Sequence, residues 1–192
     1  LLGGKKALLV TDKGLRAIKD GAVDKTLAHL REAGIDVVVF DGVEPNPKDT
    51  NVRDGLEVFR KEHCDIIVTV GGGSPHDCGK GIGIAATHEG DLYSYAGIET
   101  LTNPLPPIVA VNTTAGTASE VTRHCVLTNT KTKVKFVIVS WRNLPSVSIN
   151  DPLLMLGKPA PLTAATGMDA LTHAVEAYIS KDANPVTDAA AI

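Results

Sequence analysis

The residue run Gly71-Gly72-Gly73-Ser74 could bind a phosphate group. It follows an apolar segment (65–70) typical of a buried strand and precedes a segment (75–87) typical of a helix. Glycines let the backbone approach an anion, and a helix N-terminus offers unpaired N–H groups with partial positive charge. The run matches neither G-x-G-x-x-G nor the ending of a P-loop. A tight strand-to-helix turn without a ligand is therefore the alternative interpretation.

A second polar run follows the apolar segment 107–112. If that segment is a strand of a parallel sheet, the run lies beyond its carboxyl end, where ligands bind in open α/β folds. Its four hydroxyl side chains suit hydrogen bonding to a polar ligand; they belong to Thr113, Thr114, Thr117 and Ser119. A turn that caps a short helix, with Glu120 completing a capping box to Thr117, explains the same residues, and both interpretations can hold.

Asp12 stands at the end of the apolar segment 6–11. A carboxylate there could accept hydrogen bonds from a ribose diol and would repel a 2′-phosphate. A helix N-cap or a turn is the simpler interpretation. Asn46, between two prolines, is by default a loop residue and at best a ligand contact.

Asp169 and His173 lie four positions apart in an Ala-rich, helix-like segment. That spacing puts carboxylate and imidazole on one helical face. An oxygen and nitrogen donor pair suits a divalent first-row metal. Two ligands are fewer than the three or four protein ligands of a common catalytic site, and a plain contact on a surface helix is the alternative. Because an apolar stripe (Leu171, Val175, Tyr178) runs along the same segment, we expect the pair near a core boundary.

The other histidines and cysteines carry weaker patterns. His76 lies one turn into the helix predicted over 75–87 and could face a ligand. His63, His88 and His124 are expected at the surface or at a core boundary. Cys78 is expected to pack as a small residue within the helix.

The elements that must position these residues follow an alternating order. Strands are predicted over 6–11, 35–40, 65–70 and 107–112, and helices over 15–33, 49–63 and 75–87. Strands that alternate with helices are typical of an α/β domain with a Rossmann-like parallel sheet.

The pattern changes after residue 120. Segments 121–127 and 134–139 alternate in polarity, which predicts an antiparallel hairpin appended to the sheet. A short strand is predicted over 146–150 and a helix over 161–180. We place a boundary near residues 156–159, which divides the chain into an α/β domain (1–157) and the start of a helical domain (158–192).

Composition argues against several classes of protein. Nineteen Lys and Arg against 22 Asp and Glu give a net charge of −3, so no basic excess indicates a nucleic-acid or anionic lipid partner. The longest apolar runs, such as 37–40, are too short to span a bilayer, and the first residues lack a signal-peptide pattern. Three cysteines without a CxxC pair fit a reducing compartment. The expected protein is cytoplasmic, with neither membrane nor nucleic acid as partner.

Three motifs in series resemble those of the iron-dependent (group III) alcohol dehydrogenase family. They are Gly71-Gly72-Gly73-Ser74-x-x-Asp77-x-x-Lys80, the run from Thr113 to Thr122, and Asp169-x-x-x-His173-Ala174-x-Glu176. Within the family, the residues around 73–84 and 93–103 are most similar to the 1,3-propanediol dehydrogenase branch.

The resemblance implies an NAD-binding α/β domain followed by an all-helical, metal-binding domain. It implies NAD and Fe²⁺ as cofactors, with Zn²⁺ or Mn²⁺ as alternatives, and a homo-oligomer that acts on a small alcohol or aldehyde. The reaction would be hydride transfer between 1,3-propanediol and 3-hydroxypropanal. Lactaldehyde/1,2-propanediol or methanol as substrate, a zinc enzyme of the glycerol dehydrogenase or dehydroquinate synthase type, and an NAD-binding fragment without turnover are the alternatives.

The resemblance also assigns roles residue by residue. Asp12 would contact the adenosine ribose and Asn46 the cofactor from a loop. Gly72, Gly73 and Ser74 would hold the pyrophosphate, with Asp77 on the cofactor side of the same helix. The remaining contacts are Thr113, Thr114 and Thr117, around the adenine and pyrophosphate, and Lys135, at the ribose. Asp169 and His173 would be the first two metal ligands and act in catalysis through the metal. Two further histidine ligands are expected beyond Ile192, and a short strand before Leu1.

Overall fold

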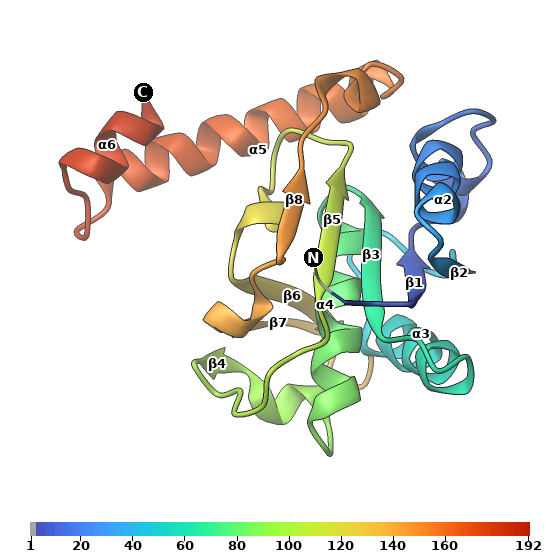
Figure 1. Ribbon diagram of the computed structural model, residues 1–192. Coiled ribbons are helices and arrows are strands. Elements are labelled where there is room, and N and C mark those ends of the chain that lie inside the picture. Colours follow the sequence, from blue (N-terminus) through green and yellow to red (C-terminus); the bar gives the residue numbers. More distant parts are fainter. Residues whose placement is uncertain (1–2) are drawn as a thin grey trace.

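Five short apolar segments form a parallel sheet in the computed structural model, which describes residues 3–192 (Figure 1). The strand order is β2-β1-β3-β5-β8. The bounds are Lys6–Val10 (β1), Asp36–Phe40 (β2), Ile66–Gly71 (β3), Ile108–Asn112 (β5) and Val147–Ile149 (β8). The three central strands β1, β3 and β5 are mainly apolar because the central strands of a parallel sheet are buried on both faces. The predicted Rossmann-like α/β domain is confirmed.

Helices cover the two faces of the sheet. On one face, α2 (Ala22–Glu32) packs on Ala7 and Leu9 of β1. On the other, α3 (Asp49–Lys61) and α4 (Gly73–Thr87) pack on Leu8 and Val10. Successive β1 residues therefore enter opposite cores, as the alternation of a strand requires.

Glycines allow α4 to pack tightly against its neighbours. A Cβ built on Gly81 would lie 2.7 Å from Val52 Cγ2 of α3, which is closer than real contacts. A Cβ on Gly79 would overlap the methyl group of Thr69 in β3. The glycines of α4 thus bring the helix close to both α3 and the sheet.

The helix predicted over 15–33 is divided in two. The short α1 (Lys13–Arg16) begins at the Asp12 cap, and α2 begins after Gly21. Between them Asp20 has a positive φ of 55°, which a continuous helix does not accommodate. The spacing of apolar residues is helix-like on both sides of this turn, so it does not reveal the break.

The predicted hairpin forms, but it belongs to a second sheet. The strands β6 (His124–Asn129) and β7 (Val134–Val139) are antiparallel, and β4 (Gly97–Ile98) pairs with β7 to give the order β4-β7-β6. Its inward residues Cys125, Leu127, Phe136 and Ile138 share the core of α4. Because these side chains bury against the helix, the hairpin covers α4 instead of extending the parallel sheet.

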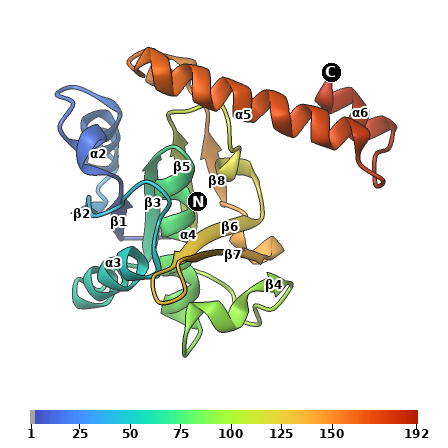
Figure 2. The same cartoon turned by 180° about the vertical axis from the view of Figure 1, so that it is seen from behind.

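The C-terminal helices extend away from the sheet (Figures 1 and 2). Helix α5 (Ala160–Ile179) crosses the end of the molecule at which the parallel strands finish, and α6 (Pro185–Ala191) follows it. No residue of either helix is buried. The prediction that the Asp169–His173 pair lies near a core boundary is therefore wrong, since the apolar residues Leu171, Val175 and Tyr178 of the same helix are all at least half exposed.

Four 3₁₀ turns complete the described residues: Leu92–Tyr95, Ser119–Val121, Trp141–Asn143 and Pro152–Met155. Across residues 3–192, no helix has the length and apolarity needed to cross a bilayer.

Candidate functional site

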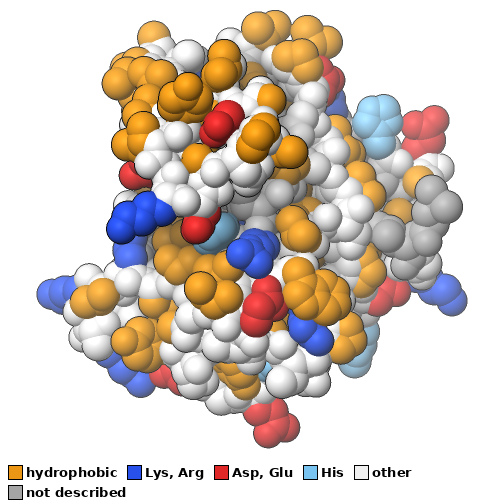
Figure 3. All heavy atoms as spheres, turned by 90° about the vertical axis from the view of Figure 1, so that its left-hand side faces the viewer, with side chains coloured by type: hydrophobic (Ala, Val, Ile, Leu, Met, Phe, Trp, Pro, Cys, Tyr) orange, Lys and Arg blue, Asp and Glu red, His pale blue; other side chains and the backbone are white. Residues whose placement is uncertain are grey.

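A cleft of about 1590 Å³ opens at the carboxyl ends of the parallel strands, with the hairpin on one side and α5 on another. All twelve predicted site residues line this cleft: Asp12, Asn46, Gly72, Gly73, Ser74, Asp77, Thr113, Thr114, Thr117, Lys135, Asp169 and His173. In the space-filling view, apolar side chains gather over the C-terminal helices, and charged and histidine side chains lie below them (Figure 3). Residues up to 161 positions apart in sequence, from Asp12 to His173, thus share one cavity.

The glycine run forms the turn from β3 into α4. Gly71 has a φ of 148°, and a Cβ built on it would lie 2.6 Å from Pro75 Cγ. Gly72 is the N-cap, and no side chain caps this end of the helix. The helix therefore begins at Gly73, slightly before the predicted Ser74 and Pro75. The N–H groups of Gly73 and Ser74 have no partner within the helix and are available to an anion in the cleft.

The polar segment Thr113–Thr117, called the threonine run from here on, packs directly on the glycine run, Gly71–Ser74. A Cβ on Gly72 would lie 2.7 Å from Thr114 Oγ1, and a Cβ on Gly73 would lie 2.8 Å from Thr117 Oγ1. The Thr113 N–H donates to the Gly71 carbonyl at 2.9 Å. The alternative capping box from Thr117 to Glu120 does not form, because Ala118, with a φ of 52°, is the N-cap of the turn at Ser119–Val121. The two runs form one wall of the cleft.

Asp12, Asn46 and Lys135 lie at different parts of the cleft. Asp12 caps α1, since its Oδ1 accepts from the Leu15 N–H at 2.9 Å, and it also lines the cleft. The simpler interpretation of Asp12 is thus correct without excluding a ligand. Asn46 is exposed with a φ of 55°, and Lys135 is exposed on β7.

Asp169 and His173 face the cleft from α5, with 3.7 Å between Asp169 Oδ1 and His173 Nε2. Metal–ligand distances near 2.1 Å are typical of such donors, so both atoms could reach one ion. Their side chains are 44% and 58% exposed, which leaves the donors accessible. A Cβ on Gly116 would lie 3.3 Å from Asp169 Oδ2, so the threonine run reaches the pair. Within residues 3–192, no group of three or more such side chains could hold a metal.

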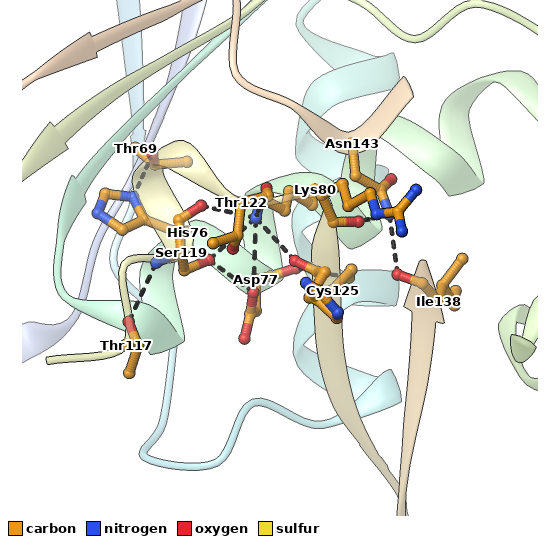
Figure 4. A network of polar contacts seen from close by, with 12 residues as sticks. Thr69, His76, Asp77, Lys80, Thr117, Ser119, Thr122, Cys125, Ile138 and Asn143 are labelled. Carbon is orange, nitrogen blue, oxygen red and sulfur yellow. Dashed lines mark hydrogen bonds and ion pairs between the residues drawn. The ribbon is translucent and has the colours of Figure 1, made fainter. Parts of the chain in front are cut away.

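His76, which the sequence allowed to face a ligand, is not among the residues that line the cleft. It is buried, and its Nδ1 lies 2.7 Å from Thr69 Oγ1 between α4 and β3 (Figure 4). Burial, with a smaller contribution from the Lys80 charge, lowers the pKa of His76 to about 4. The imidazole is therefore neutral at physiological pH and serves packing.

Asp77 lies at the edge of the cleft, and its carboxylate contacts buried groups. Its Oδ1 accepts from Ser119 Oγ at 2.8 Å and lies 4.0 Å from Lys80 Nζ. Burial raises the pKa of Asp77 to about 6, and the Lys80 ammonium opposes this shift. The sequence predicts no site role for Lys80 or His124. Lys80 is in the first motif, whereas His124 lines the cleft and only the fold places it there.

Comparison with known proteins identifies the family. Residues 1–152 match the model of the iron-containing alcohol dehydrogenases, and residues 163–192 match the C-terminal model of the Fe-containing alcohol dehydrogenase family. The chain is 93% identical over its whole length to 1,3-propanediol dehydrogenase of Klebsiella pneumoniae, and 48% identical over its whole length to NAD-dependent methanol dehydrogenase of Bacillus methanolicus. It covers 50% of each, so it spans about half the length of these relatives.

Solved structures agree with this result. The crystal structure of 1,3-propanediol oxidoreductase matches with a TM-score of 0.96 and 93% identity, over 99% of this chain and 49% of that one. The first family model spans more than half of the chain. The chain therefore belongs to the iron-containing alcohol dehydrogenase family.

Proposed function

We propose that the protein is an NAD-dependent, metal-dependent alcohol dehydrogenase that interconverts 1,3-propanediol and 3-hydroxypropanal. The observation that carries the reaction class is the cleft, in which an anion-binding helix terminus and an Asp–His donor pair share one cavity. The substrate is proposed from the 93% identity to the Klebsiella pneumoniae enzyme. A homo-oligomer belongs to the same proposal.

The glycine and threonine runs would hold the cofactor. The N–H groups of Gly73 and Ser74 point from the end of α4, where the helix dipole favours the pyrophosphate. Thr113, Thr114 and Thr117 would contact the adenine and pyrophosphate, and Asp77 would contact the cofactor beside α4. Asp12 would bind the ribose diol, as acidic residues do in dinucleotide folds, with Asn46 and Lys135 as further contacts. Bound NAD⁺ would supply the hydride acceptor.

Asp169 and His173 would hold a divalent metal, for which we propose Fe²⁺, with Zn²⁺ and Mn²⁺ also compatible with such donors. The bound metal would supply a Lewis acid for the alcohol or aldehyde oxygen. Two donors are fewer than a catalytic site commonly uses, so we propose that the others come from the part of the relatives that this chain does not cover. Residues 1–157 would form the cofactor domain, and residues 158–192 would begin the metal domain.

Two alternative functions are each supported by a separate observation. The similarity to the methanol dehydrogenase and a 44% identity to lactaldehyde reductase of Escherichia coli support other small alcohols as substrates. The pair of metal donors, without a third among residues 3–192, supports NAD binding without turnover by this part of the protein.

One assay separates these functions. The protein, loaded with Fe²⁺, is mixed with NAD⁺ and with 1,3-propanediol, 1,2-propanediol or methanol, and NADH formation is followed by absorbance. The proposal predicts the highest kcat/KM for 1,3-propanediol. A higher kcat/KM for 1,2-propanediol or methanol would make that alcohol the substrate in place of 1,3-propanediol. Binding of NAD⁺ in calorimetry without turnover of any alcohol would favour the binding function, and absence of NAD⁺ binding would contradict both.

A further inference from the structure

Lys80 is fully buried, yet its ammonium has a complete set of oxygen partners. Its Nζ donates to the backbone carbonyls of Ser119, Thr122 and His124 at 2.7, 2.9 and 2.7 Å (Figure 4). Ser119 Oγ lies 3.1 Å away and Asp77 Oδ1 4.0 Å away. An ammonium carries three hydrogens, so the three carbonyls alone can satisfy it.

The bonded segment 119–124 has few backbone partners of its own. It contains one short 3₁₀ turn and then irregular chain until β6 begins at His124. Carbonyls that have no backbone donor need donors from elsewhere, and Lys80 donates three bonds from α4, to the 3₁₀ turn (Ser119), to the irregular chain (Thr122) and to the first residue of β6 (His124). The segment is therefore tied to α4 chiefly through the Lys80 side chain, beside the single bond from Ser119 Oγ to Asp77.

Movement of this segment away from α4 would be costly. A buried charge is tolerated only when it is paired and hydrogen-bonded, and Lys80 would lose all three carbonyl hydrogen bonds and keep only the Asp77 carboxylate of its own helix. Burial lowers the pKa of Lys80, and the nearby Asp77 carboxylate opposes this shift. The Asp77 backbone carbonyl also accepts from Cys125 Sγ at 3.3 Å, which is a second link between α4 and β6.

The tied segment is part of the cleft wall. Ser119, Thr122 and His124 all line the cleft, as does Asp77 on the helix side. The segment directly continues the threonine run that packs on Gly72 and Gly73. Its position therefore influences the distance between the two runs that would hold the cofactor.

We propose that Lys80 is a positioning residue for the cofactor cleft: its ammonium fixes segment 119–124 on α4 and so maintains the fit between the glycine and threonine runs. This inference rests on the proposed function for the identity of the ligand, NAD⁺. The fixed segment itself is a property of the chain and can be measured without a ligand.

The test compares variants that differ in the cation and in its charge partner. Lys80→Met removes the ammonium but leaves the Asp77 carboxylate buried, so the double variant Asp77→Asn/Lys80→Met removes both charges. Asp77→Asn alone is the reference for the double variant. Lys61→Met, at an exposed lysine near the end of α3, is the matched control.

Hydrogen exchange is the first readout. Relative to Asp77→Asn, the double variant should exchange the amides of 119–124 at least about tenfold faster, while the amides of β1 and β3 keep their rates. Calorimetric titration is the second readout, and the double variant should bind NAD⁺ at least about tenfold more weakly. Lys61→Met should match the wild type in both.

Two results would overturn the proposal. Unchanged exchange at 119–124 in the double variant would show that Lys80 does not fix the segment. Uniformly faster exchange along the whole chain in both Lys80 variants would make Lys80 a residue of global stability only. If the wild type does not bind NAD⁺, the proposed function fails, and the exchange readout still decides the role of Lys80.

Discussion

Gly73 and Thr117 touch so closely that a Cβ built on Gly73 would lie 2.8 Å from Thr117 Oγ1 and 2.9 Å from Thr117 Cγ2. The two residues follow β3 and β5, which are neighbours in the parallel sheet. The cleft wall is thus built from two turns whose contact leaves no space for a side chain on the helix.

Gly73→Ala should disturb this contact. The added methyl group must push the threonine run outward, so we expect a loss of about 1–3 kcal/mol in the free energy of unfolding, which is typical of overpacking. NAD⁺ affinity should fall by about tenfold or more. Gly83→Ala on the same helix is the control. Its Cβ would lie 3.6 Å from the nearest atom, so it should gain up to about 1 kcal/mol and bind NAD⁺ normally. Equal behaviour of both variants in denaturant titration and calorimetry would refute the role of the contact.

Asp12 should set the choice between NAD⁺ and NADP⁺. Asp12→Ser keeps a side-chain oxygen for the Leu15 N–H and so preserves the α1 cap, but it removes the charge. We expect NAD⁺ affinity to fall by about tenfold and NADP⁺ affinity to rise, because the repulsion of a 2′-phosphate is lost. Calorimetry with both nucleotides measures the ratio. A wild type that already binds NADP⁺ more tightly would contradict the assignment.

Asp169 and His173 should each be needed for metal binding and neither for folding. Both side chains are partly exposed on a helix without buried residues, so alanine at either position should change the free energy of unfolding by less than about 0.5 kcal/mol. Iron content of the metal-loaded protein, measured by elemental analysis, should fall sharply in both variants. Thr172→Ala, beside His173, is the control and should keep its iron. Wild-type iron content in both variants would exclude the pair as ligands.

His76 and Asp77 should give opposite contributions to the pH dependence of stability. The pKa of His76 is lowered to about 4, so its stabilising contribution is lost as pH falls from 6.5 toward 4, where the unfolded chain takes up the proton first. The pKa of Asp77 is raised to about 6, so the folded chain takes up that proton first and acidification from pH 6 to 4 is stabilising. Each effect approaches about 3 kcal/mol, and the two nearly cancel in the wild type.

Asp77→Asn should therefore expose the histidine effect. Its free energy of unfolding should fall with acidification between pH 6 and 4 more steeply than that of the wild type, and His76→Gln should show the opposite slope. Denaturant titrations at several pH values give these slopes. Parallel curves for the wild type and both variants would refute the two pKa shifts.

Much of the fold follows from local patterns in the sequence. The apolar runs of the parallel strands and the glycine turn after β3 predicted the sheet and the start of α4 closely. The break at Asp20 and Gly21 was missed because the apolar spacing continues on both sides of it. The two-residue β4 is too short to leave a pattern, and the placement of the hairpin on α4 depends on tertiary burial.

The candidate site could be predicted where the residues form compact motifs. Gly72, Gly73, Thr113 and Asp169 follow from motif and spacing, and the fold brings them together. His76 was misjudged because its direction within α4 depends on Thr69, which no local pattern reveals. Lys80 belongs to the first motif by its spacing. Its carbonyl partners lie 39 to 44 residues away in sequence, so the motif alone does not reveal its contacts.

The glycines of α4 have a consequence for how this cleft tolerates change. Gly79, Gly81 and Gly83 lie in the interior of one 15-residue helix, and each disfavours helix by about 1 kcal/mol relative to alanine. The segment would be a poor helix in isolation, and its conformation is maintained by the surfaces it fits, among them Val52 and Thr69. Substitutions at those distant core positions should therefore loosen the end of the helix that faces the cleft, and cofactor affinity would report on core packing.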